Sequence, residues 1–504
     1  MAEILLTTLN ARYAHCSLGL RALMANMGEL ESRTALREFT ISDTIPEIAE
    51  KILALQPRIV GIGIYVWNAV QSEQLIGLLK RVAPELMVVA GGPEVSYADL
   101  RLDLTPADHI VRGEGEIAFA ALCRRLLAGE AAERIIEAGK IDLAAVQSPY
   151  RCYSDSDIRQ RTLYVEASRG CPFACEFCLS SLDRELRDGQ LQQFLCDMEQ
   201  LWQRGARAFK FIDRTFNLKV ATSTAILDFF LGKDEPCFLH FEVIPDHFPA
   251  ELRQRIARFP AASLQLEIGV QTLNSEVAGR IRRRVRQEKM WDNLAFLEST
   301  HAHLHLDLIV GLPGESLASF GAGLNRLVAA SRAEIQIGIL KNLPGTTLSR
   351  HDGEWGMVYA AEAPYEILCN DLIPFAEMQR MKRFARYWDL FYNSGNFSRT
   401  VRLLWPDGEV YGRFGAFCDW FYSACGTTWQ IALDKQAELL FRYLLEQQGL
   451  DGETVAELLV ADLLAGKCRR LPPFLAGYRA FAPGLQGEAT AGGGANKRQK
   501  RHAG

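Results

Sequence analysis

The chain has 504 residues, more than one ordinary hydrophobic core holds, so two or three domains are expected. Hydrophobic residues make up 48% and charged residues 23%, which is typical of a globular protein in water. The net charge of -5 argues against nucleic acid as a partner, and no apolar run is long enough to cross a bilayer. The N-terminus lacks the pattern of a secretion signal, so a cytoplasmic location is expected.

The first 130 residues alternate short apolar runs with amphipathic segments. The runs EILLTTL, LREFTI, IVGIGIY, LMVVAGG and HIVRG are apolar throughout, which predicts parallel strands with both faces of the sheet covered by helices. We therefore expect an α/β domain with a Rossmann-like parallel sheet over residues 1–130. Ligands of such sheets bind at the carboxyl ends of the strands.

The rest of the chain divides by pattern into four segments. Residues 131–160 are polar and rich in turn residues, which indicates a linker. Six strand-helix units follow over 161–345 and favour a partial (β/α)6 TIM-like barrel. Residues 346–483 predict a mainly helical C-terminal domain, and the glycine-rich, basic tail over 484–504 is expected to be disordered.

Three of the twelve cysteines form a cluster in the segment RGCPFACEFC. Cys171, Cys175 and Cys178 have the spacing C-x-x-x-C-x-x-C on a loop at the carboxyl end of the first barrel strand, where barrel active sites are built. A structural zinc site would need a fourth ligand, and neither a histidine nor a fourth loop cysteine lies nearby. Three thiolates instead suit an iron-sulfur cubane with one open iron. The other nine cysteines are expected to be small buried hydrophobes in a reducing compartment.

This spacing, with aromatic Phe177 before the last cysteine, resembles the radical S-adenosylmethionine (SAM) superfamily. The resemblance implies a [4Fe-4S] cluster on Cys171, Cys175 and Cys178, with SAM chelating the open iron. It further implies reductive cleavage of SAM to methionine and a 5′-deoxyadenosyl radical. An electron donor such as flavodoxin or ferredoxin is then required.

Further stretches are similar to the SAM-binding features of that superfamily. In FIDRTFN, Asp213 and Arg214 stand where polar contacts to the methionine part of SAM are usual, although the standard glycine-rich motif is missing. In EIGVQT, Glu267 and Gln271 could orient SAM or the cluster loop. The alternative for Glu267 is an interior carboxylate in a salt bridge.

Two later features concern the fifth barrel strand. The strand ends in GLPGES, where Gly311 and Gly314 permit close backbone approach to a ligand. The superfamily often places this turn near the adenosine of SAM. His301, His303 and His305 alternate before this turn and are expected on one face of the strand. Packing against the helical layer is the expected role of these histidines, with a metal triad as the alternative.

Three loops at strand ends mark the first domain. Tyr65 ends one strand, Gly91 and Gly92 end the next, and Gly113 and Glu114 follow in HIVRGEGE. Paired glycines at a strand end let a backbone lie against a flat ligand, and bulk at Gly92 is expected to block the ligand. Neither GxGxxG nor GxxxxGK[ST] is present, so NAD and ATP lose support.

In this order, ahead of the cysteine motif, these loops resemble the cobalamin-binding domain of cobalamin-dependent radical SAM enzymes. The resemblance covers about residues 1–345, and the helical region looks like the C-terminal domain of an uncharacterised branch. Many cobalamin proteins carry D-x-H-x-x-G, with a histidine that binds cobalt. Here His15 follows Tyr13 in place of the aspartate, so a cobalt without a protein imidazole is expected.

The resemblance thus implies an enzyme with a [4Fe-4S] cluster, SAM and cobalamin that methylates an unactivated carbon of an unknown substrate. One alternative is a radical cyclase, rearrangement or oxidation enzyme with the same cofactors. A second is a tRNA methylthiotransferase, which would need another cysteine cluster where only Cys16 and Cys123 occur. A third is a non-catalytic cluster or cobalamin sensor.

Overall fold

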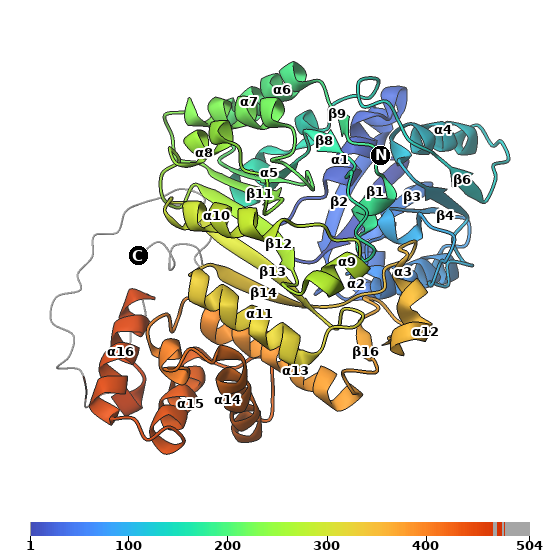
Figure 1. The fold of residues 1–504 in the computed structure, drawn as a ribbon. Coiled ribbons are helices and arrows are strands. Elements are labelled where there is room, and N and C mark those ends of the chain that lie inside the picture. Colours follow the sequence, from blue (N-terminus) through green and yellow to red (C-terminus); the bar gives the residue numbers. More distant parts are fainter. Residues whose placement is uncertain (1, 467–470, 476–477, 479–504) are drawn as a thin grey trace. The chain divides into compact units, whose positions relative to one another are not determined.

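The computed structural model describes residues 2–466, 471–475 and 478 (Figure 1). They form two compact units. The first holds Met1–Thr215, Lys341–Ser349 and Tyr359–Glu366, and the second holds the remaining described residues. The division between Thr215 and Phe216 falls inside the segment expected as one barrel domain. The tail over 484–504, expected to be disordered, lies outside the described residues.

The first unit contains a six-stranded sheet in the order β2-β1-β3-β4-β5-β6, with every pairing parallel. The five expected strands are present, and the strands are β1 (Ile4–Asn10), β2 (Thr34–Thr40), β3 (Ile59–Gly63), β4 (Met87–Gly91), β5 (His109–Arg112) and β6 (Ile135–Glu137). All seven residues of β1 are buried, as expected for a strand with both faces covered. The order reverses between β1 and β3, the place where such sheets bind ligands.

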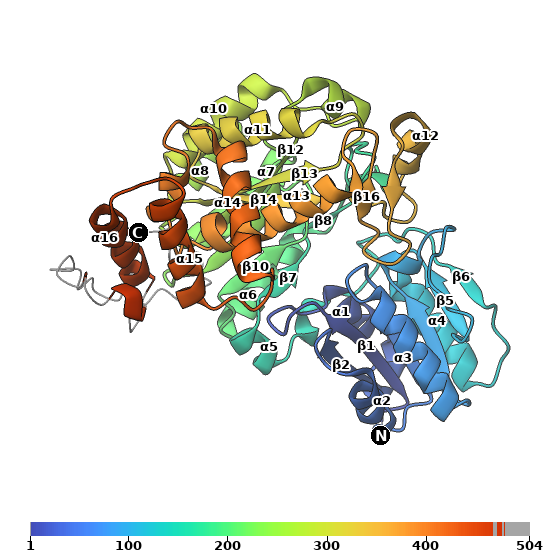
Figure 2. The ribbon, with the colours of Figure 1, turned by 90° about the horizontal axis from the view of Figure 1, so that it is seen from below.

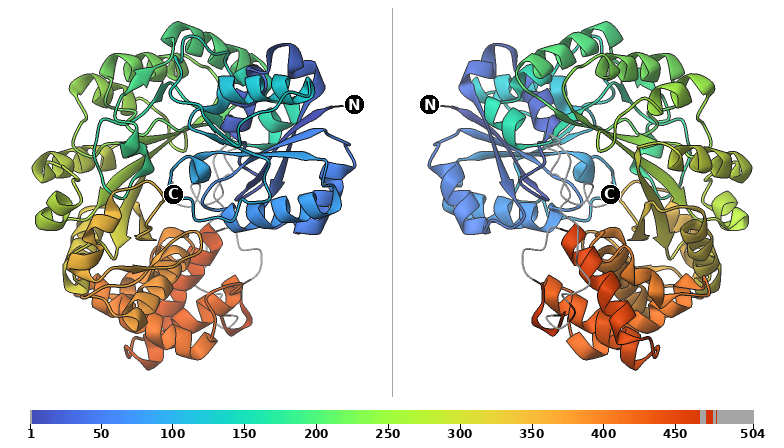
Figure 3. Two further views of the ribbon diagram at one scale, coloured as in Figure 1. Left: turned by 90° about the vertical axis from the view of Figure 1, so that its right-hand side faces the viewer. Right: turned by 90° about the vertical axis from the view of Figure 1, so that its left-hand side faces the viewer.

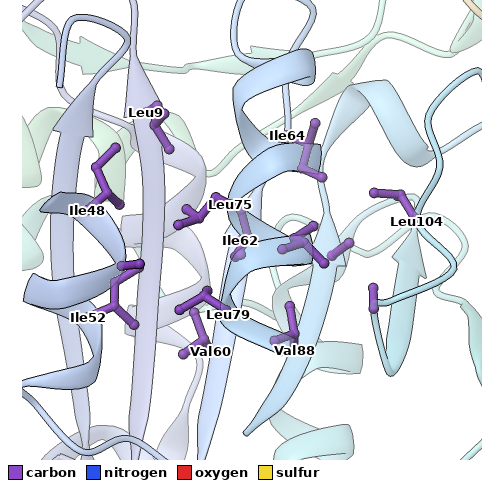
Figure 4. Close-up of a cluster of buried hydrophobic side chains, with 14 of the residues drawn as sticks. Leu9, Ile48, Ile52, Val60, Ile62, Ile64, Leu75, Leu79, Val88 and Leu104 are labelled. Atoms are coloured by element: carbon purple, nitrogen blue, oxygen red, sulfur yellow. The ribbon is translucent and has the colours of Figure 1, made fainter. Parts of the chain in front are cut away.

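Helices cover both faces of this sheet (Figure 3). On one face Ile48, Ile52, Leu75 and Leu79 pack against Val60 and its neighbours (Figure 4). On the other face Leu20 and Phe119 pack against the strands. The helices are α2 (Ile45–Leu53) and α3 (Ala69–Val82) on the first face, and α1 (Leu18–Ala25) and α4 (Gly115–Leu127) on the second.

The segment 131–160 is more structured than the expected linker. It adds β6 to the edge of the sheet and forms α5 (Asp155–Gln160), which begins with a capping box between Ser154 and Asp157. Two of the three β6 side chains are exposed, so the strand leaves no apolar pattern in the sequence.

The first unit continues into the cysteine segment. Here β7 (Leu163–Val165) pairs in parallel with β10 (Ala208–Phe211), and α6 (Leu191–Gln203) lies between them in the chain. The two-residue strands β8 (Ser168–Arg169) and β9 (Arg187–Asp188) pair antiparallel on either side of the cysteine loop.

The second unit holds the other four strands expected between 161 and 345. They pair in parallel in the order β14-β13-β12-β11. Their bounds are β11 (Phe238–Val243), β12 (Leu264–Gln271), β13 (His303–Val310) and β14 (Glu334–Ile339). The connecting helices are α7 (Val220–Leu231), α8 (Ala250–Ile256), α9 (Ser275–Arg280), α10 (Gln287–Glu298) and α11 (Leu317–Ala330).

The C-terminal region is mainly helical, as expected (Figure 2). After α12 (Asp352–Trp355) and the short strands β15 (Val358–Tyr359) and β16 (Ile367–Cys369), it forms α13 (Phe375–Trp388), α14 (Val410–Cys425), α15 (Leu433–Glu446) and α16 (Gly452–Ala465). Its aromatic residues form a core, in which Phe384, Trp388 and Phe414 are buried and in ring contact. No helix of the described chain is long and apolar enough to cross a membrane.

Candidate functional site

A cavity of about 660 Å³ lies at the carboxyl edge of the first sheet, entirely within the first unit. Its lining includes all five residues that the sequence marks on the strand-end loops: Tyr65, Gly91, Gly92, Gly113 and Glu114. Glu166, Ala167 and Arg169, which precede the cysteine loop, also line the cavity, as do Gln193 and Asp197 of α6. The strand-end loops and the entry to the cysteine loop therefore share one cavity.

Glycines make room on the face of the sheet that α1 and α4 cover. Gly61, Gly63 and Gly91 line the cavity, and Gly91 lies on the same side of β4 as Val89, which also lines it. A Cβ at Gly91 would meet nothing nearer than the Val111 carbonyl oxygen at 3.6 Å. A flat ligand could therefore lie against the backbone at Gly91, whereas at Gly61 the Phe119 ring, 2.7 Å from an added Cβ, already fills the space.

Gly92 lines the cavity, and its backbone conformation limits what can replace it. Its φ of +104° suits glycine, and a Cβ there would lie 2.6 Å from the Ile64 carbonyl oxygen. A side chain at this position collides with the protein's own backbone before it can fill the cavity. The glycine is therefore needed for the turn after β4.

Tyr65 lines the cavity just after the end of β3. Its ring stacks on Trp67 with a centroid distance of 4.5 Å. The Asn68 side chain accepts a hydrogen bond from the Tyr65 amide at 2.8 Å and fixes the loop. Burial raises the pKa of the Tyr65 phenol, so the group is a neutral hydroxyl at the cavity.

These residues fit a corrinoid on chemical grounds. Cobalamin has a flat ring with amide side chains around its edge, so it needs a smooth wall and several neutral or acidic polar partners. The glycines and Tyr65 supply the wall. Asn26, Gln147, Gln193 and Asp197 all line the cavity and can exchange hydrogen bonds with amides.

His15 is not among the residues that line the cavity. Its Nδ1 lies 2.8 Å from the Tyr164 hydroxyl, and its backbone forms a bridge to Thr162. Burial lowers the pKa of His15, with smaller contributions from Lys210 and Arg12. The imidazole thus links the loop after β1 to β7, the strand that contains Tyr164.

The cysteine loop is fixed at its base by backbone interactions. Arg169 and Arg187 are register partners in the β8–β9 pair, and the Cys171 amide donates to the Asp183 carbonyl oxygen at 2.8 Å. Gly170 has a φ of +98°, and a Cβ there would collide with the Glu185 carbonyl. Only glycine can enter the loop in this conformation.

The thiols fit a cluster better than a single ion. Cys171 and Cys175 are buried and Cys178 is half-buried. Within the described chain no group of three or more His, Cys, Asp or Glu side chains could hold one metal ion. In a cubane each thiolate binds a different iron, so its sulfurs stand further apart than the ligands of one ion. Three loop thiols without a fourth ligand suit a cluster with an open iron.

Asp213 supports the entry to this loop. Its carboxylate accepts hydrogen bonds from the Ala167 amide at 3.0 Å and from the Ser168 amide and hydroxyl, both at 2.6 Å. Burial raises the pKa of Asp213 to about 7 despite these bonds. Both oxygens hold the strand that precedes the cysteines, and the contact with SAM suggested by the sequence stays a prediction. Its neighbour Arg214 is exposed.

Glu267 and Gln271 lie in β12 of the second unit. The Glu267 carboxylate lies 2.8 Å from His240 Nε2 and shares a proton with it. This pairing matches the alternative for Glu267, an interior carboxylate in a salt bridge. Gln271 ends the strand at a register shift and has a φ of +69°. Their contacts with SAM stay a prediction.

The glycines after β13 are enclosed by the protein's own side chains. A Cβ at Gly311 would lie 2.8 Å from Ile367, and one at Gly314 would collide with Arg280. Both have positive φ angles, so the turn itself requires glycine. Strand β13 begins at His303, so His301 precedes it, and the His303 ring pairs with Glu334 at 3.0 Å.

Several site residues escape sequence reasoning. Ion pairs around the cysteine loop involve Arg169, Arg187 and Glu116. In the sequence, only their position close to the cysteine segment and the RGEGE stretch could have indicated these residues. Gln193 and Asp197 lie on one side of α6 that faces the cavity, four residues apart, a spacing usual on any polar helix face.

Three family models match the chain. They are the B12 binding domain over residues 4–123, the Radical SAM superfamily over residues 165–326, and a "Protein of unknown function (DUF4080)" over residues 353–483. The cobalamin-dependent radical SAM methyltransferase TokK of Streptomyces tokunonensis is 27% identical over 350 residues, which cover 60% of this chain and 50% of TokK. The chain spans half or less of the length of the curated relatives it matches first.

Two solved structures share the fold. TsrM of Kitasatospora setae, with cobalamin and a [4Fe-4S] cluster bound, has a TM-score of 0.56 at 16% identity, covering 70% of this chain and 75% of that one. The cobalamin-dependent SAM radical enzyme OxsB with aqua-cobalamin bound has a TM-score of 0.61 at 13% identity, covering 92% and 80%.

Fold, cavity and cysteine loop together define a radical SAM protein with a cobalamin-type sheet. The chain is similar to cobalamin-dependent radical SAM enzymes in both of these parts. The cofactors that these matches imply are a [4Fe-4S] cluster, SAM and cobalamin, and they match the cavity and the three loop thiols.

Proposed function

We propose that this enzyme methylates an unactivated carbon of a small molecule. One observation carries the proposal: Ala167 and Arg169 line the cavity and stand directly before Cys171 in the same compact unit. The cavity that suits a corrinoid therefore adjoins the loop that suits the cluster. When bound, the cluster and SAM supply a 5′-deoxyadenosyl radical and cobalamin supplies a methyl group.

The chain's own residues then have defined tasks. Cys171, Cys175 and Cys178 bind the cluster, while Asp213 and Gly170 hold the loop in the required conformation. The glycine wall and Tyr65 bind one face of the corrinoid and keep water from it. Holding two reactive groups close removes the cost of a bimolecular encounter, which is the main service a radical methylation needs.

Two features weigh against the second alternative, a tRNA methylthiotransferase. Cys16 and Cys123 are buried singly, and burial raises the pKa of each thiol to about 12. Thiols that resist ionisation are poor cluster ligands. None of the cysteines of the described chain forms a disulfide, which fits the reducing, cytoplasmic location that we propose. We further propose a flavodoxin or ferredoxin as the electron donor.

The test uses anaerobically reconstituted full-length protein. We expect about four irons per chain beyond background, and formation of 5′-deoxyadenosine after reduction. Replacement of all three loop cysteines by alanine should abolish both. The matched control is Cys196→Ala, at an exposed position in α6, which should leave both unchanged. SAM cleavage by the triple variant would contradict the proposal.

The reaction type is tested in cells that make or lack the protein and grow on methionine with a deuterated methyl group. A product that carries the labelled methyl group only in the presence of the protein supports methylation. A product of unchanged mass would instead support the cyclase, rearrangement or oxidation alternative. Intact cofactors without SAM cleavage would support the sensor.

A further inference from the structure

An ion-pair network joins the cavity to the base of the cysteine loop. Glu114 lines the cavity and meets Arg187 with both oxygens, at 2.5 Å to Nη2 and 3.0 Å to Nη1. Arg187 lies in β9, on the far side of the cysteine loop from Arg169 in β8. The network therefore connects a wall of the cavity to both ends of the loop.

Arg169 completes the connection from the other strand. Its Nη1 lies 2.9 Å from Glu116, in the first turn of α4, and 3.4 Å from Glu114, the residue before that helix, and both residues line the cavity. A bidentate or shared arginine fixes orientation as well as charge. Glu114 thus contacts both arginines of the register pair Arg169–Arg187, and Glu116 adds a second contact to Arg169.

The same network reaches the first cysteine through the backbone. Arg187 donates to Asp183 at 2.7 Å, and the Asp183 carbonyl oxygen accepts the Cys171 amide at 2.8 Å. Glu114 also accepts the Ile141 amide at 2.6 Å, while Arg187 donates to the Ile141 carbonyl at 2.7 Å. Each carboxylate oxygen of Glu114 is therefore bound to the loop base or its neighbour.

These groups are well shielded from solvent. The side chains of Glu114 and Arg187 are 16% and 14% exposed, and Glu116 is 8% exposed. Burial favours a neutral Glu114, but Arg187 and the Ile141 amide outweigh it and lower the pKa of Glu114. Shielded pairs persist in salt, and losing one partner leaves the other charge without compensation.

We propose that Glu114 and Arg187 are positioning residues that couple the corrinoid cavity to the cluster loop, so that filling either site strengthens binding at the other. This inference rests on the proposed function for the identity of the two ligands. Cluster assembly orders the loop and, through Arg187, the Glu114 wall of the cavity. Cobalamin that binds to an already ordered wall loses less conformational entropy, so it binds more tightly. By thermodynamic linkage, bound cobalamin stabilises the cluster loop to the same extent.

The test measures cobalamin affinity of the full chain by absorbance, with and without the cluster. In the native protein, assembly of the cluster should tighten cobalamin binding on the order of tenfold, within the usual range of coupling between sites. In Glu114→Gln the ratio of the cobalamin affinity with the cluster to that without it should fall to about one. Arg187→Lys keeps the charge but loses the two-point contact, so it should give the same result.

The matched control is Glu137→Gln, which removes the carboxylate paired with Arg112 on the exposed edge strand β6. It should keep the native ratio. Melting temperatures of all variants without cofactors identify any that fail to fold, and the Arg187 and Glu114 variants serve as alternatives to each other.

The outcomes separate the two proposals. A native ratio near one, or the same ratio in native protein and both network variants, overturns the inference while SAM cleavage and methylation stand. Failure to bind cobalamin under any condition overturns both. A second readout is the electron paramagnetic resonance spectrum of the reduced cluster without SAM. It should shift on cobalamin binding in native protein and Glu137→Gln, and stay unchanged in Glu114→Gln.

Discussion

The Tyr365 hydroxyl donates a hydrogen bond to the buried Glu94 carboxylate, although 271 residues separate them in the chain. Both belong to the first unit, where Arg101 also lies over the Tyr365 ring at 4.7 Å. Glu94 directly follows Pro93, which lines the cavity. Residues 359–366 thus support the loop after β4 from a distant part of the sequence.

Tyr365→Phe should therefore loosen the loop after β4. Glu94 is 3% exposed, so it would be left buried without the phenol, at a cost of about 1–3 kcal/mol. We expect faster amide hydrogen exchange over residues 93–101, measured by mass spectrometry. The control Tyr13→Phe removes a phenol that is 54% exposed and should change exchange little. Unchanged protection over residues 93–101 in Tyr365→Phe would show that the Tyr365–Glu94 hydrogen bond does not stabilise the loop.

Substitutions at Gly91 and Gly92 should have different effects. A side chain at Gly91 meets no close backbone, so Gly91→Val should fold and lose most cobalamin affinity. Gly92→Ala collides with Ile64, so it should lower the melting temperature even without cobalamin. Melting curves and cobalamin titrations of both variants provide the comparison. Tight cobalamin binding by Gly91→Val would place the corrinoid elsewhere.

His15→Ala should leave the electronic structure of bound cobalamin unchanged, because His15 bonds to Tyr164 outside the cavity lining. The measurement is the nitrogen hyperfine pattern of cob(II)alamin in native and variant protein. Cobalamin affinity should change by less than about twofold, a difference of under 0.5 kcal/mol. A histidine-derived pattern that disappears in the variant would identify His15 as a cobalt ligand after all.

Glu315 should make stability depend on pH. Burial raises its pKa to about 7, while Thr272 and Ser319 donate hydrogen bonds to it. Because the folded pKa is raised, the protonated folded state is favoured below the ordinary value near 4.5. This stability is lost as pH rises through about 7, in total roughly 3 kcal/mol.

Glu315→Gln keeps a neutral side chain at all pH values, so its melting temperature should fall less than that of native protein between pH 5 and 8. The control Glu276→Gln lies at an exposed position in α9 and should follow the native curve. Parallel curves for native protein and Glu315→Gln would mean that the carboxyl titrates normally.

Much of the fold follows from local patterns. Strand β1 is buried throughout and its sequence is apolar throughout, so composition alone predicts it. The exposed edge strand β6 has no such signal, because pairing at one edge requires little apolar surface. The aromatic segment from Phe375 to Cys425 was expected to be helical, and packing explains its composition.

The candidate site was predictable where a motif carries the chemistry. The three cysteines could be named because their spacing is specific, whereas the glycines could be named only from their place at strand ends ahead of the cysteine motif. The Glu114–Arg187 and Glu94–Tyr365 contacts join residues 73 and 271 positions apart, so no local pattern contains them. Asp213 was found by position, but its bonds to Ala167 and Ser168 depend on how two strands meet.

The base of the cysteine loop is set without help from sulfur. The β8–β9 pairing, the Asp213 bonds and the Cys171 amide bond to Asp183 all use backbone or carboxylate groups. The base of the loop can therefore form before the cluster does, so that the thiols stay available to the machinery that delivers iron and sulfide, and assembly of the cluster then orders the rest of the loop. Cluster insertion then follows folding of the chain. A chain that loses its iron to oxygen keeps the base of the loop, so a new cluster can be inserted and the chain need not be degraded.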